Sequence, residues 1–111
     1  MNNPRSLTLA LCLGGVLAWG PALADGDPEA GRAKALTCMG CHGIPGYFTV
    51  YPTYKVPKLA GQHPEFLVAA LMAYKNGERS HKTMVAQASS LSEADMQDIA
   101  AYFAAMSGEG K

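Results

Sequence analysis

The sequence has little charge, few cysteines and one tryptophan. Its 111 residues include nine Lys plus Arg and nine Asp plus Glu, so that 16% are charged and the formal net charge is zero. This balance provides no basic surface for a phosphate backbone, and we therefore expect no nucleic acid partner. The apolar content of 49% argues against disorder. The length corresponds to one domain of about 100–200 residues, which excludes a multidomain enzyme.

The sequence also lacks an apolar run long enough for a spanning helix, which needs about 20 residues. The longest run covers residues 7–19, with one cation, Arg5, before it and small residues at 22–24 after it. This order is typical of a secretory signal. We predict a signal peptide at residues 1–24, cleaved after export by the general secretory route, with an uncleaved anchor as the alternative. Residues 25–111 are then expected to form a single domain without a stable membrane span.

Cleavage would leave two cysteines, Cys38 and Cys41, which form the motif C-x-x-C-H with His42. The motif indicates covalent haem attachment, because two thiols one helical turn apart can add to two vinyl groups of a porphyrin. The imidazole that follows can bind the iron. A thioredoxin-type redox pair, half a zinc site and a disulfide are alternatives. The redox pair would need a strand-rich context, and the zinc site would need a second pair of ligands; the sequence has neither. A disulfide between Cys38 and Cys41 would close only a very short loop.

The rest of the chain predicts an all-α fold around a pocket. Asp27-Pro28 starts a first helix that reaches about residue 37, and Gly31 within it indicates a close helix crossing. Residues 43–62 contain three prolines and predict a loop. A second helix is expected over about residues 63–76, with an apolar face made of Phe66, Leu67, Ala70, Leu71 and Tyr74.

The last helix has the clearest start. Ser92 and Asp95 form an acidic variant of a capping box, and the helix is expected to end near residue 107. Its apolar repeat comprises Met96, Ile99, Ala100 and Phe103.

The order of these features resembles class I cytochrome c. The similarity is strongest to one half of the bacterial periplasmic two-haem cytochromes c, and is carried by PKLAGQHPEFL, YKNGER, TM and LSEADMQDIAAYF. It covers residues 27–106, and only one C-x-x-C-H is present. The resemblance implies the class I cytochrome c fold, with three to five helices around one covalently bound haem c.

The resemblance also implies a function and a location. It predicts a periplasmic monohaem electron carrier, not an enzyme, that exchanges single electrons with redox protein partners as a monomer or weak dimer. One alternative is a haem subunit docked on a dehydrogenase or oxidase. The other is a haem protein with a labile methionine ligand that binds small molecules or acts as a peroxidase. The aromatic segment 46–54 is expected either to shield a haem edge or to form a partner surface.

The sixth iron ligand decides between these functions. Met84 is the candidate, since we expect it in a loop between the middle and last helices, where the family places its methionine ligand. The other methionines after residue 24 lie in the haem motif or at helix positions unsuited to ligation, namely Met39, Met72, Met96 and Met106. His81 and His63 are alternative ligands. The resemblance further implies that the carbonyl of Pro57 accepts a hydrogen bond from His42.

Overall fold

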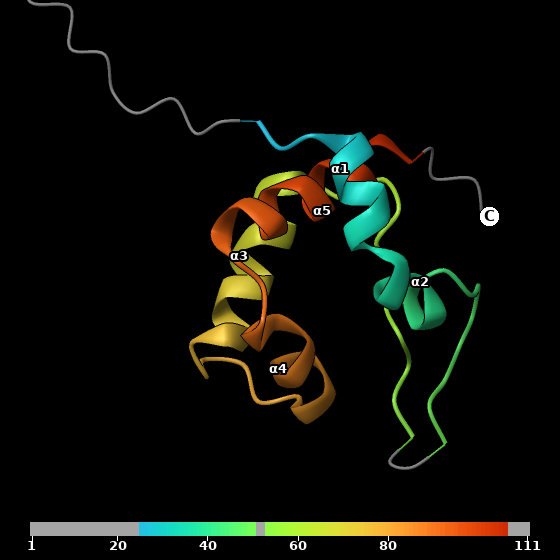
Figure 1. Ribbon diagram of the computed structural model, residues 1–111. Coiled ribbons are helices and arrows are strands. Elements are labelled where there is room, and N and C mark those ends of the chain that lie inside the picture. Colours follow the sequence, from blue (N-terminus) through green and yellow to red (C-terminus); the bar gives the residue numbers. More distant parts are fainter. Residues whose placement is uncertain (1–24, 51–52, 107–111) are drawn as a thin grey trace, which may run out of the picture.

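The computed structural model describes residues 25–50 and 53–106, and the predicted signal peptide at 1–24 lies outside these residues. The described part contains five helices and no regular strand (Figure 1). They are α1 (Pro28–Lys34), α2 (Leu36–His42), α3 (Pro64–Lys75), α4 (Lys82–Ser89) and α5 (Glu93–Ala105). The expected all-α architecture is confirmed.

α1 and α5 cross at a glycine, as expected. A methyl group on the buried Gly31 would lie 1.9 Å from the backbone oxygen of Asp98 and 2.9 Å from the Cβ of Tyr102. A methyl group on Gly26 would lie 2.1 Å from the backbone oxygen of Gln97, a second close approach that the sequence analysis did not anticipate. Glycine is required at both positions because the two backbones nearly touch.

Polar contacts also stabilise the crossing of α1 and α5. The Lys34 Nζ lies 2.7 Å from an Asp95 carboxylate oxygen and 2.6 Å from one of Asp98. The Asp27 backbone N–H, at the N-cap of α1, donates to the other Asp98 oxygen over 2.8 Å. Ser92 and Asp95 form the predicted capping box at the start of α5. The two helices are thus joined by backbone contact and by charge.

The core lies between α1, α3 and α5. It contains Ala35, Leu67, Ile99, Ala100 and Phe103, and Met96 is also fully buried. All four apolar positions predicted for the last helix are therefore buried.

The predicted apolar face of α3 was partly wrong. Phe66 is 54% exposed, whereas Val68 packs against the core. α3 packs on both α5 and α4, so its buried side is centred on Leu67. Phe66 precedes Leu67 by one residue, or about 100° around the helix, and turns outward.

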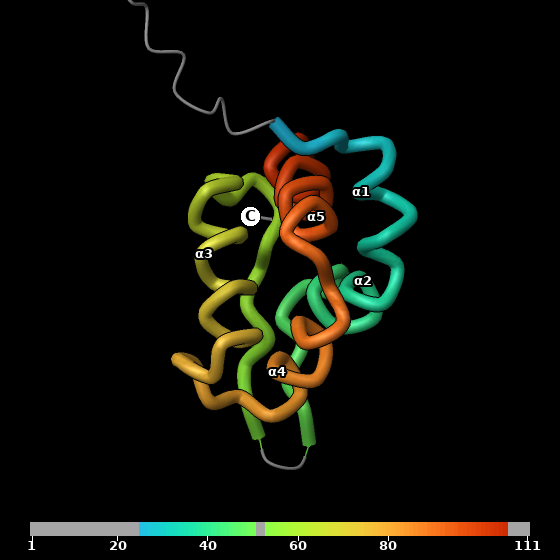
Figure 2. Tube along the Cα trace, turned by 60° about the vertical axis from the view of Figure 1, so that its left-hand side comes forward, coloured from blue at the N-terminus to red at the C-terminus, as the bar shows by residue number. Residues whose placement is uncertain are grey.

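The first helix extends further than predicted, with a bend. α1 ends at Lys34, and the chain continues as α2 as far as His42 (Figure 2). At the bend, the N–H of Ala35 donates to the Gly31 carbonyl over 2.8 Å, and the Ala35 carbonyl accepts from the Met39 N–H over 3.0 Å. These hydrogen bonds bridge the bend, so the haem motif lies on a continuation of the helix that crosses α5.

The described residues of this segment, 43–50 and 53–62, form a loop, as expected, and two stretches of it pair as antiparallel arms. Phe48 and Lys55 form an isolated antiparallel bridge, and the Thr49 N–H donates to the Tyr54 carbonyl over 2.9 Å. Figures 1 and 2 both show the two arms side by side, extending away from α2. We refer to residues 47–50 and 53–56 as the hairpin.

Candidate functional site

The three residues of the C-x-x-C-H motif lie on α2, and His42 is the last residue of this helix. Cys38 and Cys41 are one helical turn apart, half-buried and not joined by a disulfide. Cys38 packs against the hydrophobic core, and burial raises the pKa of its thiol above the usual range. The motif thus lies on a regular helix that packs against the hydrophobic core through Cys38.

His42 is oriented by the end of the loop. Its Nδ1 lies 2.7 Å from the Pro57 carbonyl oxygen. Because a carbonyl oxygen can only accept, Nδ1 is the donor in this hydrogen bond and Nε2 is left for another bond. This contact is the one that the family resemblance implies.

Met84 lies in a helix, and the prediction that it sits in a loop was wrong. It is the third residue of α4 and is half-buried. His81 is the N-cap of this helix, and its Nδ1 accepts from the Met84 N–H over 3.4 Å. Ala88, fully buried, secures the other end of α4. The helix was missed because histidine is an unusual N-cap and neither glycine nor proline marks its end.

The two alternative histidine ligands are placed differently. The ring of His81 packs against Tyr54, with ring centroids 5.0 Å apart and an angle of 60° between the planes. His63 is exposed at the N-cap of α3, and its side chain makes no capping hydrogen bond. Only His81 therefore belongs to the helix that carries Met84.

The motif and Met84 lie on helices that do not contact each other. α2 packs against α1, and α4 packs against α3. In Figure 1 they lie on different sides of the molecule, linked through α1, α3 and α5. The chain thus presents two thiols and an imidazole on one helix and a thioether on another. This donor set fits a haem, with soft sulfur and imidazole as possible axial ligands and two thiols for covalent attachment.

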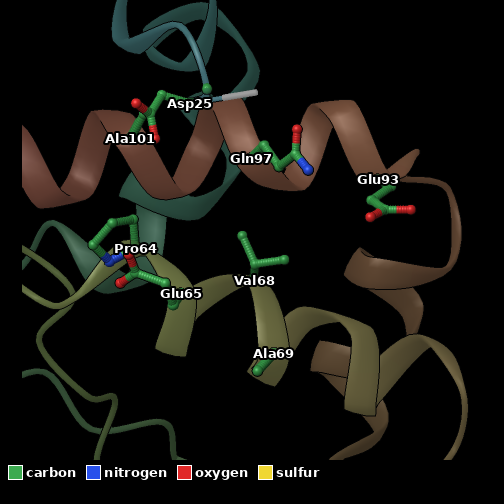
Figure 3. Close-up of a pocket in the computed structure, with 9 residues that line it drawn as sticks. Asp25, Pro64, Glu65, Val68, Ala69, Glu93, Gln97 and Ala101 are labelled. Atoms are coloured by element: carbon green, nitrogen blue, oxygen red, sulfur yellow. The ribbon is translucent and has the colours of Figure 1, made fainter. Parts of the chain in front are cut away.

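Two cavities lie in the described part of the chain, and one of them adjoins α4. One, of about 440 Å³, lies between the N-terminal segment, α3 and α5 (Figure 3). It contains none of the predicted site residues. The other, of about 330 Å³, is lined by Tyr54, Ser80, His81, Lys82 and Thr83 and so adjoins the first turn of α4.

Two kinds of feature are absent from residues 25–50 and 53–106. Within them, no three side chains of His, Cys, Asp or Glu are grouped closely enough to hold a metal ion on their own. No helix in this part of the chain has the length and apolarity needed to cross a membrane.

A model of the cytochrome c family matches residues 29–107. The chain belongs to the cytochrome c family. The family implies covalently bound haem c, and the relatives named cytochrome c4 are electron-transfer proteins rather than enzymes, so the expected fold and cofactor are confirmed. No site residue is assigned by this match.

Several proteins are similar to this cytochrome c. Cytochrome c4 of Pseudomonas aeruginosa is 42% identical over 102 residues, which are 92% of this chain and 48% of the relative. Cytochrome c-554(548) of Halomonas halodenitrificans is 40% identical, over 70% of this chain and 94% of the relative. The cytochrome subunit of sulfide dehydrogenase of Chlorobaculum tepidum is 31% identical, over 78% of this chain and 76% of the relative.

A solved structure of a cytochrome c4 is also similar to this chain. The cytochrome c4 of Acidithiobacillus ferrooxidans has a TM-score of 0.57 and 27% identity, and the match covers 76% of this chain and 53% of that one. The chain spans about half the length of the cytochrome c4 relatives. This proportion agrees with the expected resemblance to one half of a two-haem cytochrome.

Proposed function

We propose that this cytochrome c is a periplasmic monohaem electron carrier in which His42 and Met84 are the axial ligands of the iron. The observation that carries the proposal is the hydrogen bond between His42 and Pro57 at the end of the haem motif. A ligating imidazole usually donates its other N–H to a carbonyl or carboxylate, which fixes the ring and makes it more basic. Pro57 would serve this purpose here.

The two thiols would attach the cofactor. The Sγ of Cys38 and that of Cys41 would each be joined to one carbon of a vinyl group of the haem, and the thiol hydrogen would go to the other carbon of that group. The addition needs no oxidant or reductant. Because the two cysteines are one turn apart on α2, both can reach one edge of a porphyrin.

Bound haem c supplies one-electron exchange between ferric and ferrous iron. Met84 would complete the coordination, and its soft thioether favours the ferrous state relative to a second imidazole. A six-coordinate iron gives electron transfer without a substrate site, and transient redox partners are expected to dock weakly. Residues 1–24 are proposed as the cleaved signal peptide and residues 25–111 as the single haem domain, a monomer or weak dimer.

Absorption spectra of the ferrous protein, with and without carbon monoxide, test the proposed ligands. Wild type should be low-spin and unaffected by carbon monoxide, and Met84→Ala should bind it. Met72→Ala is the matched control, since Met72 is a half-buried methionine on α3, and it should behave as wild type. Binding by wild type would overturn the closed iron and favour the small-ligand or peroxidase-like alternative. An unreactive Met84→Ala protein would point to His81 or His63 as the ligand.

A second candidate function is a haem subunit docked on a dehydrogenase. It is favoured by the similarity to the cytochrome subunit of sulfide dehydrogenase, of which this chain covers 76%. Gel filtration of the native periplasmic extract, followed by haem staining, separates the two functions. A free carrier should elute at the size of the chain alone, whereas a subunit should co-elute with a larger flavin- or metal-containing protein.

A further inference from the structure

Tyr54 connects the hairpin to the helix that carries Met84. Its ring meets the ring of His81 edge-on, with centroids 5.0 Å apart. The Tyr54 backbone is fixed from the opposite arm, because its carbonyl accepts from the Thr49 N–H over 2.9 Å and its N–H donates to the Thr49 Oγ1 over 3.1 Å. The Tyr54 backbone is therefore fixed, and its ring, although 50% exposed, contacts the His81 ring.

His81 uses the same ring for a second contact. Its Nδ1 accepts from the backbone N–H of Met84 and so begins α4. At 3.4 Å this hydrogen bond is long compared with the usual 2.7–3.2 Å. A weak cap of this kind depends on the ring staying in place, and Tyr54 is the ring that packs against it.

Tyr54 and His81 line one cavity together with the first turn of α4. The cavity of about 330 Å³ is lined by Tyr54, His81 and their neighbours Ser80, Lys82 and Thr83. Of the residues that line this cavity, Tyr54 is the one whose ring contacts the His81 ring.

We infer that Tyr54 and His81 form a latch that sets how readily the Met84 sulfur leaves the iron. The inference rests on the proposed function, in which Met84 is an axial ligand. Tyr54 acts as a positioning residue: it holds the His81 ring, the ring holds the Met84 backbone, and the backbone sets where the sulfur can reach. Loss of the Tyr54 ring should speed opening of the iron without removing the ligand.

Imidazole binding to the ferric protein, followed by stopped-flow absorption, tests the latch. At high imidazole the rate should level off at the rate of Met84 dissociation. Tyr54→Leu should raise this limiting rate about ten-fold, whereas Tyr54→Phe, which keeps the ring, should stay within about two-fold of wild type. Phe48→Leu is the matched control, since it removes a 53% exposed ring from the opposite arm of the hairpin, and it should leave the rate unchanged.

A double-mutant cycle separates the latch from a general loosening of the hairpin. In a His81→Asn background, where the ring is gone but a capping side chain remains, Tyr54→Leu should change the limiting rate less than about two-fold. An equal effect in both backgrounds, or no effect of Tyr54→Leu in wild type, would overturn the latch. If Tyr54→Leu does not accumulate, Tyr54→Met carries the same expectations.

Failure of the underlying proposal looks different. If Met84 is not a ligand, wild type and Met84→Ala will bind imidazole at the same rate. That result overturns the axial ligand and the latch together. A different pair of results would overturn the latch alone. Imidazole binding would saturate in wild type but not in Met84→Ala, and Tyr54→Leu would have the limiting rate of wild type.

Discussion

The crossing of α1 and α5 and the region around the haem motif differ in how their structure is secured. At the crossing, Gly31 fits against the α5 backbone, and the charges of Lys34, Asp95 and Asp98 join the helices. Large exposed apolar side chains are instead concentrated between Leu36 and Tyr54, where they include Ile44, Phe48 and Val50. The first region is held by the polypeptide itself. The second contains the proposed attachment residues and one proposed ligand, His42, and we expect its structure to depend on the bound porphyrin.

The size of the chain makes such dependence reasonable. A domain of fewer than about 100 residues buries only about 60–65% of the surface of its unfolded chain, and small domains commonly need a cofactor or disulfide. A ligand that binds only the folded state stabilises it. The two regions should therefore respond differently to substitution.

Replacing both attachment cysteines should affect the haem-motif region most. In Cys38→Ser/Cys41→Ser, covalent haem should be lost completely, because no thiol remains to form a thioether. Haem staining of a denaturing gel should be negative, and far-ultraviolet circular dichroism should show a partial loss of helix. Full helix content without haem would mean that the region is as self-sufficient as the α1–α5 crossing.

Gly31→Ala should break the other region. The added methyl group would meet the Asp98 backbone oxygen at 1.9 Å, so the helices must separate. We expect a loss of about 3 kcal/mol in the free energy of unfolding, with an unchanged haem spectrum. Denaturant titration measures this free energy. Arg32→Ala, at an exposed position of α1, is the control and should stay within about 0.5 kcal/mol of wild type. A mild effect of Gly31→Ala would show that the crossing is less tight than described.

Ser92→Ala should cost less. It removes the hydroxyl that accepts from the Asp95 N–H over 3.1 Å in the capping box of α5. Loss of an N-cap hydrogen bond lowers the free energy of unfolding by about 1 kcal/mol. Ser90→Ala, at an exposed residue with only a backbone role at the end of α4, is the control and should be neutral.

The charges at the crossing should give the smallest effect and a dependence on pH. The Lys34 ammonium lowers the carboxyl pKa of both Asp95 and Asp98 from the usual 3.8, and the side chains of Asp95 and Asp98 raise the pKa of Lys34 above 10.5. A lowered carboxyl pKa gives stability that is present above 3.8 and is lost as the pH falls through the folded pKa values. The Lys34 contribution is lost as the pH rises through its raised pKa.

Thermal unfolding of wild type and Lys34→Met tests this expectation. The wild-type midpoint should be higher at neutral pH, by a small margin because solvent still reaches these partly exposed charges and screens them. The difference should shrink below pH 3.8 and also above pH 10.5. A difference that does not vary with pH would assign the effect to the packing of the Lys34 side chain.

Local signals in the sequence were sufficient for much of the fold. Gly31, Asp27 and Ser92 act within a few residues or through a backbone requirement, and all three were predicted. α4 was missed because its N-cap is a histidine, and the exposure of Phe66 was missed because it depends on how α3 packs against α5.

The candidate site divides in the same way. The C-x-x-C-H motif is local and specific, so its chemistry could be predicted from spacing. The role of Pro57 came from resemblance, since nothing in the spacing of His42 and Pro57 predicts a contact across 15 residues. The meeting of Tyr54 and His81 had no signal at all, because two rings 27 positions apart come together only through the fold.

The contact between Lys75 and Leu91 has a consequence for how the iron could open. The Lys75 ammonium donates to the Leu91 carbonyl and ties the end of α3 to the start of α5. The segment between them, residues 76–90, therefore begins and ends at neighbouring points, and α4 packs mainly on α3. Such a segment can unfold and refold as a local unit while the helices outside it stay assembled. Departure of Met84 from the iron would then require only a local fluctuation of about 15 residues. Amide hydrogen exchange in α4 should accordingly be faster than in α5.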